Sequence, residues 1–173
     1  SKPLDKYGSR GIFIIHDQNE IRKKALQTVE YTNCQEILIE EYNDGYEFNM
    51  MTWVMDGRVN VVSIADREKT EVEEGMLPIS TRNVYPSRFL TEVEKGATDV
   101  LQRYIGYTGQ TEGALSMQFF WKPGKGIQVC EIAGRFFGYE HELTDMVYGF
   151  QIEELLLDYL YEKERIREMF AKH

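Results

Sequence analysis

Apolar residues recur along this chain at two spacings, one typical of strands and one typical of helices. Two extended runs, Tyr46 to Met55 and Arg58 to Asp66, are separated only by Asp56-Gly57. An Asp-Gly pair between two such runs is a strong signal for a tight turn between antiparallel strands. The sequence therefore predicts a β-hairpin over these residues.

The segment before this hairpin predicts a strand, a helix and a second strand. The stretch GIFIIHD, residues 11–17, has the composition of a short strand, and residues 18–32 carry apolar side chains at helical spacing. The stretch EILIEEY, residues 36–42, predicts the second strand, which residues 43–45 interrupt with the turn signal NDG. We expect a hinge there.

Helical spacing returns in the second half of the chain. Residues 91–105 predict an amphipathic helix with Thr91 as its N-cap, and a last helix is expected from Gly149 or Phe150 to near the end. Residues 67–89 have no clear period, and we expect a long loop. This loop carries unusual positive charge for the chain, from Arg67, Arg82 and Arg88, and it also holds Asn83.

A second hairpin is predicted in ALSMQFFWKPGKGIQVCEIAG, residues 114–134. A four-residue loop, residues 123–126, would make Lys122 and Ile127 the closing pair. Counting outward places an apolar face toward the core and Gln118 opposite Glu131 on the other face. The remaining pairs expected from this count are Trp121 with Gln128, Phe119 with Cys130, Met117 with Ile132, and Ser116 with Ala133.

Two interpretations of Gln118 and Glu131 remain open at this point. Polar residues in strands most often lie on the solvent face of an antiparallel sheet. An amide oxygen and a carboxylate that converge from adjacent strands are also hard ligands for Mg²⁺, which commonly binds one or two such groups together with substrate phosphates. The opening stretch KPLDKYGSRG offers a place for phosphate, because glycine-rich turns expose backbone N–H groups and Lys2 and Arg10 add positive charge.

Composition narrows the class of protein. A chain of 173 residues with 42% hydrophobic content is sufficient for one compact domain, which we expect to be α+β. The formal net charge of -9 argues against nucleic acid or an anionic membrane as a partner. Cys34 and Cys130 lack the spacing of a disulfide framework or a zinc site, so a reducing, cytoplasmic setting is expected. No apolar run approaches the length of a membrane span.

The ordered set of motifs resembles the ATP-grasp superfamily, in particular carboxylate-amine ligases and the carbamoyl phosphate synthase large subunit. The motifs are Lys2-Pro3 with residues 8–11, ILIEEYNDGYEFN, LSMQFF and CEIAGR, and they cover nearly the whole chain. The resemblance implies an ATP-grasp fold, with a truncated lid at residues 1–42 and an antiparallel-sheet core with flanking helices at residues 43–173.

The resemblance also implies roles for individual residues. The glycine-rich flap would close over the triphosphate, the end of the IEEY strand would contact adenine, and Glu47 would bind the ribose hydroxyls. The residues implied at the nucleotide are Lys2, Gly8, Ser9, Arg10, Gly11, Glu40, Glu41, Tyr42, Asn43 and Glu47. Gln118 and Glu131 fall on the positions that bind Mg²⁺ in the family, in agreement with the hairpin count.

The family resemblance implies an ADP-forming reaction. ATP would phosphorylate a small carboxylate, and an amine would attack the acyl phosphate, while Arg135 and Arg82 stabilise the developing charge. Many members carry an asparagine two residues after the metal-binding glutamate, where this chain has Ala133. Either one metal is held less fully, or the chain follows the branch with an E-x-x-x-R pattern, which assigns Arg135 to the phosphate.

A second departure concerns the N-terminus, because family members carry an N-terminal domain and an earlier lid lysine. The sequence therefore predicts a fragment or a naturally short member, inactive alone, that pairs with a missing domain or with a second copy. The alternative interpretation is an ATP-grasp-like nucleotide-binding or assembly module without catalysis. A weaker third is an ATP-grasp kinase with a stable phosphate acceptor.

Overall fold

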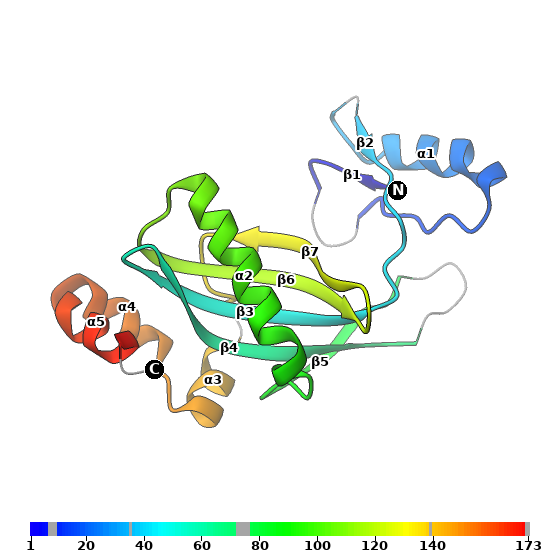
Figure 1. The fold of residues 1–173 in the computed structure, drawn as a ribbon. Coiled ribbons are helices and arrows are strands. Elements are labelled where there is room, and N and C mark those ends of the chain that lie inside the picture. Colours follow the sequence, from blue (N-terminus) through cyan, green and yellow to red (C-terminus); the bar gives the residue numbers. More distant parts are fainter. Residues whose placement is uncertain (7–9, 35, 72–76, 139, 172–173) are drawn as a thin grey trace. The chain divides into compact units, whose positions relative to one another are not determined.

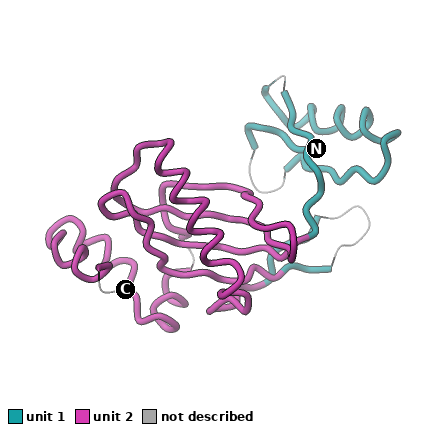
Figure 2. The backbone as a smooth tube through the Cα atoms, in the orientation of Figure 1, with its two compact units in different colours: residues 1–44, 69–81 teal, residues 45–68, 82–173 magenta. Residues whose placement is uncertain are grey.

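The computed structural model describes residues 1–6, 10–34, 36–71, 77–138 and 140–171 (Figure 1). The chain forms two compact units (Figure 2). Unit 1 comprises Ser1–Asp44 and Lys69–Thr81, and unit 2 comprises Gly45–Glu68 and Arg82–His173. The expected division into residues 1–42 and 43–173 came from the family resemblance and stays a prediction.

Unit 2 is built on an antiparallel sheet whose strand order, among the described residues, is β5-β4-β3-β6-β7. The central strand β3 pairs with β4 on one side and with β6 on the other, and β6 pairs with β7. The strands are β3 (Tyr46–Met55), β4 (Arg58–Lys69), β5 (Ser80–Val84), β6 (Gly113–Lys122) and β7 (Gly126–Ala133).

The turn between β3 and β4 confirms the first predicted hairpin. Asp56 and Gly57 both adopt positive φ angles, 51° and 73°. A two-residue turn with positive φ at both positions matches the twist of the flanking strands, and Asp-Gly is one of the pairs that adopt it readily.

Part of the predicted loop over residues 67–89 is wrong, because β4 continues to Lys69 and β5 forms a fifth strand.

One face of the sheet packs against helix α2 (Leu90–Thr108), which crosses it in Figure 1. Alternate residues of β3 point toward this helix, and they are fully buried with its inner face. The buried residues of this cluster are Phe48, Met50, Val54, Ile64, Val93, Ala97, Leu101, Ile105, Leu115, Met117 and Phe119. The predicted apolar face of the second hairpin is thereby confirmed.

The opposite face of the sheet is apolar at one end only. Met51, Trp53 and Met55 of β3 pack there against α4 (Ile152–Tyr161) and α5 (Lys163–Ala171). Glu47 and Asn49 precede them on β3 and point to the same face, since side chains alternate along a strand. This face therefore ends in polar residues, beyond the apolar cluster.

The second predicted hairpin also forms, with one difference in register. Lys122 pairs with Gly126 rather than with Ile127, so the expected pairs Trp121 with Gln128 and Phe119 with Cys130 are wrong. A β-bulge between Gln118 and Phe119 then adds one residue, Cys130, to β7 and shifts the register. Beyond the bulge the predicted pairs are confirmed: Gln118 with Glu131, Met117 with Ile132, and Ser116 with Ala133.

The helices differ from the predictions mainly at their ends. Helix α2 begins at Leu90 after an N-cap at Phe89, so Thr91 lies inside the helix and its predicted capping role is wrong. The predicted last helix is two helices, because Glu162 leaves the helical conformation between α4 and α5. Helix α3 (His141–Tyr148), which was not predicted, ends at Gly149 in the left-handed conformation.

Unit 1 contains a short two-stranded sheet of β1 (Lys2–Pro3) and β2 (Ile37–Leu38). The predicted helix over residues 18–32 is a 3₁₀ turn, η1 (Gln18–Glu20), followed by α1 (Ile21–Val29). The strand predicted over residues 11–17 is wrong. Among the described residues, its backbone and that of an earlier segment are joined by the pair of hydrogen bonds of 2.9 and 2.8 Å between Phe13 and Ser1, and no ladder forms.

Candidate functional site

A group of polar side chains occupies the end of the sheet face opposite α2. We call Glu47, Asn49, Arg67, Gln118 and Glu131 the polar end of the sheet. Gln118 lies at the centre, because its Cα pairs with Asn49 on one side and with Glu131 on the other. Three adjacent strands thus direct oxygen-bearing side chains to one surface.

Glu47 organises the central contacts of the polar end. Its carboxylate accepts a hydrogen bond from the Gln118 side-chain amide. The same oxygen, Oε1, lies 3.3 Å from Nε of Arg67. Glu47 is only 7% exposed, so this negative charge is held largely out of water by a cation and an amide donor.

The donor set at Gln118 and Glu131 suits Mg²⁺, and the ribose contact predicted for Glu47 stays a prediction. The Gln118 amide nitrogen donates to Glu47, so its carbonyl oxygen is the atom that can serve a cation. Amide and carboxylate oxygens are ligands that Mg²⁺ prefers, and it usually completes its shell with water and substrate phosphates. No group of three or more His, Cys, Asp and Glu side chains that could hold a metal occurs within the described part of the chain. A Mg²⁺ ion at these residues would therefore be bound partly by the protein and partly by phosphates or water.

A second cluster surrounds Glu140, which the sequence analysis did not single out. This residue precedes α3, is only 1% exposed, and accepts hydrogen bonds from two strands. Asn49 Nδ2 and Asn83 Nδ2 both donate to Oε1, at 2.6 and 2.9 Å, and the Tyr85 hydroxyl donates to Oε2. Asn49 belongs to both clusters, so Glu140 adjoins the polar end.

The Glu140 carboxyl has a raised pKa. Burial is the largest cause, since desolvation disfavours the charged form. The hydrogen bond from Asn49 and the charges of Arg67 and His141 act in the opposite direction. A buried carboxyl with a perturbed pKa beside a cluster of ligand-type side chains is a common feature of functional sites.

Unit 1 holds most of the residues predicted to contact the nucleotide. Lys2 Nζ of β1 lies 2.6 Å from Oε2 of Glu40, which follows β2, so two residues predicted to contact the nucleotide form an ion pair with each other. Arg10, Glu41 and Tyr42 are exposed and Asn43 is half-buried. Gly8 and Ser9 lie outside the described residues. The nucleotide roles of these residues stay predictions.

Gly11 has a conformation and surroundings that only glycine fits. Its φ angle is 73°, and an added Cβ would lie 2.5 Å from Cβ of Tyr31 and 3.0 Å from Cγ of Pro3. A close backbone approach therefore accounts for this glycine within unit 1 itself. Its expected contact with phosphate stays a prediction.

The two arginines predicted to be catalytic both make contacts within unit 2. Arg82 pairs with Glu68 of the adjacent strand β4, and its side chain is 70% exposed. Arg135 Nη1 donates to the carbonyl of Phe136 at 3.1 Å. The catalytic roles of both residues stay predictions.

Comparison with known proteins supplies the family. Residues 2–157 match the family model described as carbamoyl-phosphate synthase L chain, ATP binding domain. The chain belongs to this family. The match spans both units, from the Lys2 strand to helix α4.

Solved structures of ATP-grasp enzymes share the fold of this carbamoyl-phosphate synthase-type domain. A biotin carboxylase complex from Campylobacter jejuni aligns with a TM-score of 0.65 and 17% identity, over 88% of this chain and 34% of that chain. D-alanine–D-alanine ligase from Bacillus anthracis aligns with 0.64 and 15%, over 97% and 55%. L-amino acid ligase from Bacillus licheniformis aligns with 0.57 and 19%, over 68% and 28%.

These comparisons confirm the predicted ATP-grasp fold, in which helices flank an antiparallel sheet. The chain spans between 28% and 55% of the length of these three structures. Among curated proteins, no relative matches the sequence. None of the helices in the described residues has the length and apolar character needed to cross a membrane.

Proposed function

We propose that the chain is the ATP- and Mg²⁺-binding part of an ADP-forming ligase that joins a small carboxylate to an amine. The observation that carries the proposal is the pairing of Gln118 with Glu131 beside Glu47, on a domain of the carbamoyl-phosphate synthase type. Such a donor set binds Mg²⁺ together with phosphates, and the family is an ATP-binding one. The small carboxylate and the amine are the proposed substrate classes, and the compartment we propose is the cytoplasm.

The proposal gives each unit a task. In unit 1, Lys2 and residues 10–11 would bind the phosphates, while residues 40–43 would contact the adenine base. In unit 2, Glu131 and Gln118 would hold Mg²⁺, and Arg135 and Arg82 would stabilise charge on the transferred group. Bound at these residues, Mg²⁺ supplies positive charge to the β- and γ-phosphates.

The proposed reaction needs no nucleophilic side chain. A carboxylate oxygen of the substrate attacks the γ-phosphorus, and ADP leaves. The amine nitrogen then forms a bond to the carbonyl carbon of the acyl phosphate and gives up a proton to solvent, while the bond from that carbon to the phosphate oxygen breaks and phosphate leaves. The protein positions the reactants and offsets their charge.

The full activity is proposed only for an assembled protein. The chain spans no more than 55% of the three structures compared above, so a further domain or a second copy would complete the enzyme. The chain alone is expected to bind nucleotide without turnover.

Nucleotide binding tests the proposal directly. ATP with Mg²⁺ should raise the melting temperature of the chain by mass action. Glu131→Ala and Lys2→Ala should each reduce the shift. Glu168→Ala on α5 and Lys95→Ala on α2, which covers the opposite face of the sheet, should leave it unchanged. An equal shift in all four variants would overturn the site assignment.

A binding module without catalysis is the second candidate. The observation that favours it is Ala133, which pairs with Ser116 and offers no side-chain oxygen where many family members have asparagine. Hydroxylamine trapping separates the two candidates. ATP binding without hydroxamate or ADP release, with candidate carboxylates and the completing domain present, would favour the module.

A further inference from the structure

The Glu140 carboxylate accepts hydrogen bonds from three side chains of the protein. Asn49 comes from β3, while Asn83 and Tyr85 come from β5 and the residue after it. The two amide nitrogens share one oxygen, Oε1, and the hydroxyl uses the other, Oε2. These three bonds fix the orientation of both amide groups.

The side-chain carbonyl oxygens of Asn49 and Asn83 indicate a ligand. With both nitrogens directed at Glu140, the Asn49 and Asn83 carbonyl oxygens face away from it. Both oxygens are buried, and neither has a hydrogen-bond partner among the described residues. Asn49 is only 1% exposed. Buried polar atoms are nearly always satisfied in native proteins, so an unpartnered pair requires an explanation.

The hydrogen-bond inventory of this cluster defines the chemistry of its partner. On Asn49, Asn83 and Glu140 themselves, the unused capacity consists of acceptors: the two amide oxygens and a remaining lone pair on Glu140 Oε2. Arg67 of the adjoining polar end also acts on Glu140 with its charge, and its buried Nε has no hydrogen-bond partner among the described residues. An ammonium group offers three N–H donors, no acceptor and a positive charge. A carboxylate ligand has no donor and would be repelled by Glu140. The nearby Arg67 guanidinium is paired with the Glu47 carboxylate. Asn49, Asn83 and Glu140 together offer only acceptors and a buried carboxylate, which complement a primary ammonium group.

We infer that Asn49, Asn83 and Glu140 form a subsite for the primary amine of the second substrate, bound as ammonium. The identification of this amine with the ligase co-substrate rests on the proposed function. Asn49 pairs directly with Gln118, which pairs with Glu131, so the subsite lies beside the residues assigned to Mg²⁺ and the phosphates. An amine held there would adjoin the place where the acyl phosphate is expected.

Nuclear magnetic resonance on the ¹⁵N-labelled full chain tests the subsite. The probe is methylammonium chloride, with tetramethylammonium chloride as the matched cation that has no N–H donor. The side-chain NH₂ signals of Asn49 and Asn83 are assigned from their loss in Asn49→Leu and Asn83→Leu. Methylammonium should shift both signals saturably with one dissociation constant, and tetramethylammonium should not.

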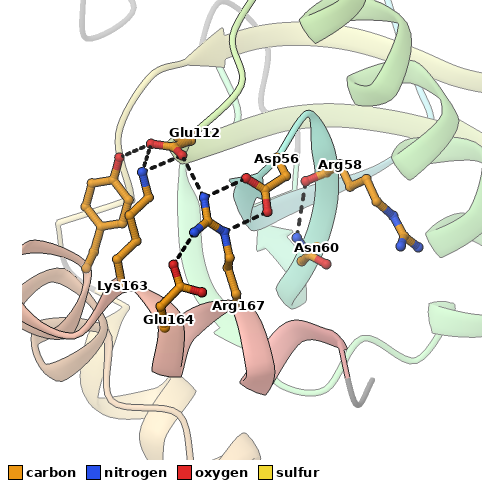
Figure 3. A network of polar contacts seen from close by, with 8 residues as sticks. Asp56, Arg58, Asn60, Glu112, Lys163, Glu164 and Arg167 are labelled. Atoms are coloured by element: carbon orange, nitrogen blue, oxygen red, sulfur yellow. Dashed lines mark hydrogen bonds and ion pairs between the residues drawn. The ribbon is translucent and has the colours of Figure 1, made fainter.

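Asn60 serves as the internal control. Its side-chain nitrogen donates to the carbonyls of Trp53 and Arg58 at the β3–β4 hairpin, in a setting unrelated to Glu140 (Figure 3). Its NH₂ signal should not respond to either cation. Equal responses of Asn60, Asn49 and Asn83, or equal responses to the two cations, would overturn the inference.

Glu140→Gln adds a second test, since it keeps the shape of the side chain and removes the charge. Loss of a charge-assisted hydrogen bond should weaken methylammonium binding at least about tenfold. Unchanged affinity in this variant would overturn the assignment of Glu140. Should the variant fail to fold, the wild-type spectra alone decide, because they require no substitution in the subsite.

A parallel titration with ATP and Mg²⁺ separates this inference from the proposed function. Nucleotide should shift the backbone signals of Gln118 and Glu131. Amine binding without any nucleotide response would leave the subsite standing and remove the ligase interpretation. A nucleotide response without amine binding would remove the subsite alone.

Discussion

Glu140 makes the stability of unit 2 depend on pH in a direction opposite to that of most carboxyls. Burial raises its folded pKa above the value of about 4.3 expected for an unfolded glutamate. Between those two pKa values the folded state binds more protons than the unfolded state. The stability that Glu140 contributes is therefore complete below the unfolded pKa and is lost as pH rises through the folded pKa.

Glu140→Gln should remove this dependence. Relative to the wild type, the variant should gain unfolding free energy as pH rises through that window, by about 1.4 kcal/mol for each unit by which burial raises the pKa. Urea unfolding between about pH 4 and pH 8 measures the difference. A difference that stays constant across this range would contradict the raised pKa.

Gly11 tests the packing of unit 1 at a single position. Gly11→Ala combines an unfavourable positive φ with overlap against Tyr31, so it should destabilise unit 1 by more than about 1 kcal/mol. Gly57 has the same φ of 73°, and no atom lies within 4 Å of the place that a Cβ would occupy there, so Gly57→Ala isolates the backbone cost. Native-state hydrogen exchange of α1 should rise in the first variant and stay unchanged in the second.

The residues of the polar end differ in how far sequence could predict them. Gln118 and Glu131 lie on one hairpin with a turn signal between them, so the sequence could place them on adjacent strands, although their register also depends on the bulge at Cys130. Glu140 meets Asn49 across 91 residues of chain, and no local pattern marks that contact. Glu140, His141 and Glu142 are consecutive in the sequence, and such a run is typical of a solvated helix start, so it does not indicate a buried carboxyl.

At the level of elements, the β6–β7 hairpin shows how a correct pair followed from an incorrect turn. The loop was predicted with four residues, whereas Lys122 pairs with Gly126 across three. This error of one residue alone would have moved Glu131 out of line with Gln118. The bulge at Cys130 adds one residue to β7 and cancels the error. Bulges carry no reliable sequence signal, so this agreement could not be anticipated.

Helix positions followed from apolar spacing more reliably than helix ends did. The α2 stripe of Val93, Ala97 and Leu101 is buried as predicted. The break at Glu162 was not, because Ile166 continues the apolar spacing of α4 into α5. Residues on both sides of the break, Leu155 and Ile166, belong to one cluster with Trp53, which lies far away in sequence.

Helix α5 is attached to the β3–β4 hairpin by an ion-pair network that depends on Arg167 (Figure 3). Its guanidinium donates to both Asp56 oxygens, at 2.9 and 3.0 Å, and also to Glu164. Lys163 and the Tyr159 hydroxyl reach Glu112 at the start of β6, each at 2.6 Å. These contacts lower the pKa of Asp56 and of Glu112.

Arg167→Ala should loosen α5 without unfolding the sheet. Amide exchange in α5 should accelerate, while exchange in β3 and β6 stays slow, because the apolar cluster around Trp53 remains. Arg167→Lys should give an intermediate effect, since lysine keeps the charge but loses the two-pronged contact with Asp56. Added salt should narrow the gap between wild type and Arg167→Ala. Equal exchange in α5 of all three proteins would contradict the attachment.

At the scale of the whole molecule, the buried apolar residues are divided very unevenly between the units. Both hydrophobic clusters of the described chain belong to unit 2. The buried residues among the described part of unit 1 are Pro3, Gly11 and Thr28, and Leu26 and Val29 of α1 remain 59% and 43% exposed. Since apolar burial supplies most folding free energy, unit 1 should open locally far more often than unit 2.

Limited proteolysis should reveal this difference through two exposed lysines on helices. Lys23 lies on α1 of unit 1, and Lys95 lies on α2 of unit 2 with 87% of its side chain exposed. Trypsin needs an unfolded segment rather than an exposed side chain, so cleavage should occur first at α1, although Lys95 is also accessible. ATP with Mg²⁺ should slow cleavage at α1 if unit 1 is the lid of the proposed nucleotide site. Equal initial cleavage rates at the two helices would contradict this prediction, because unit 1 would then be as stable as unit 2 despite its few buried residues.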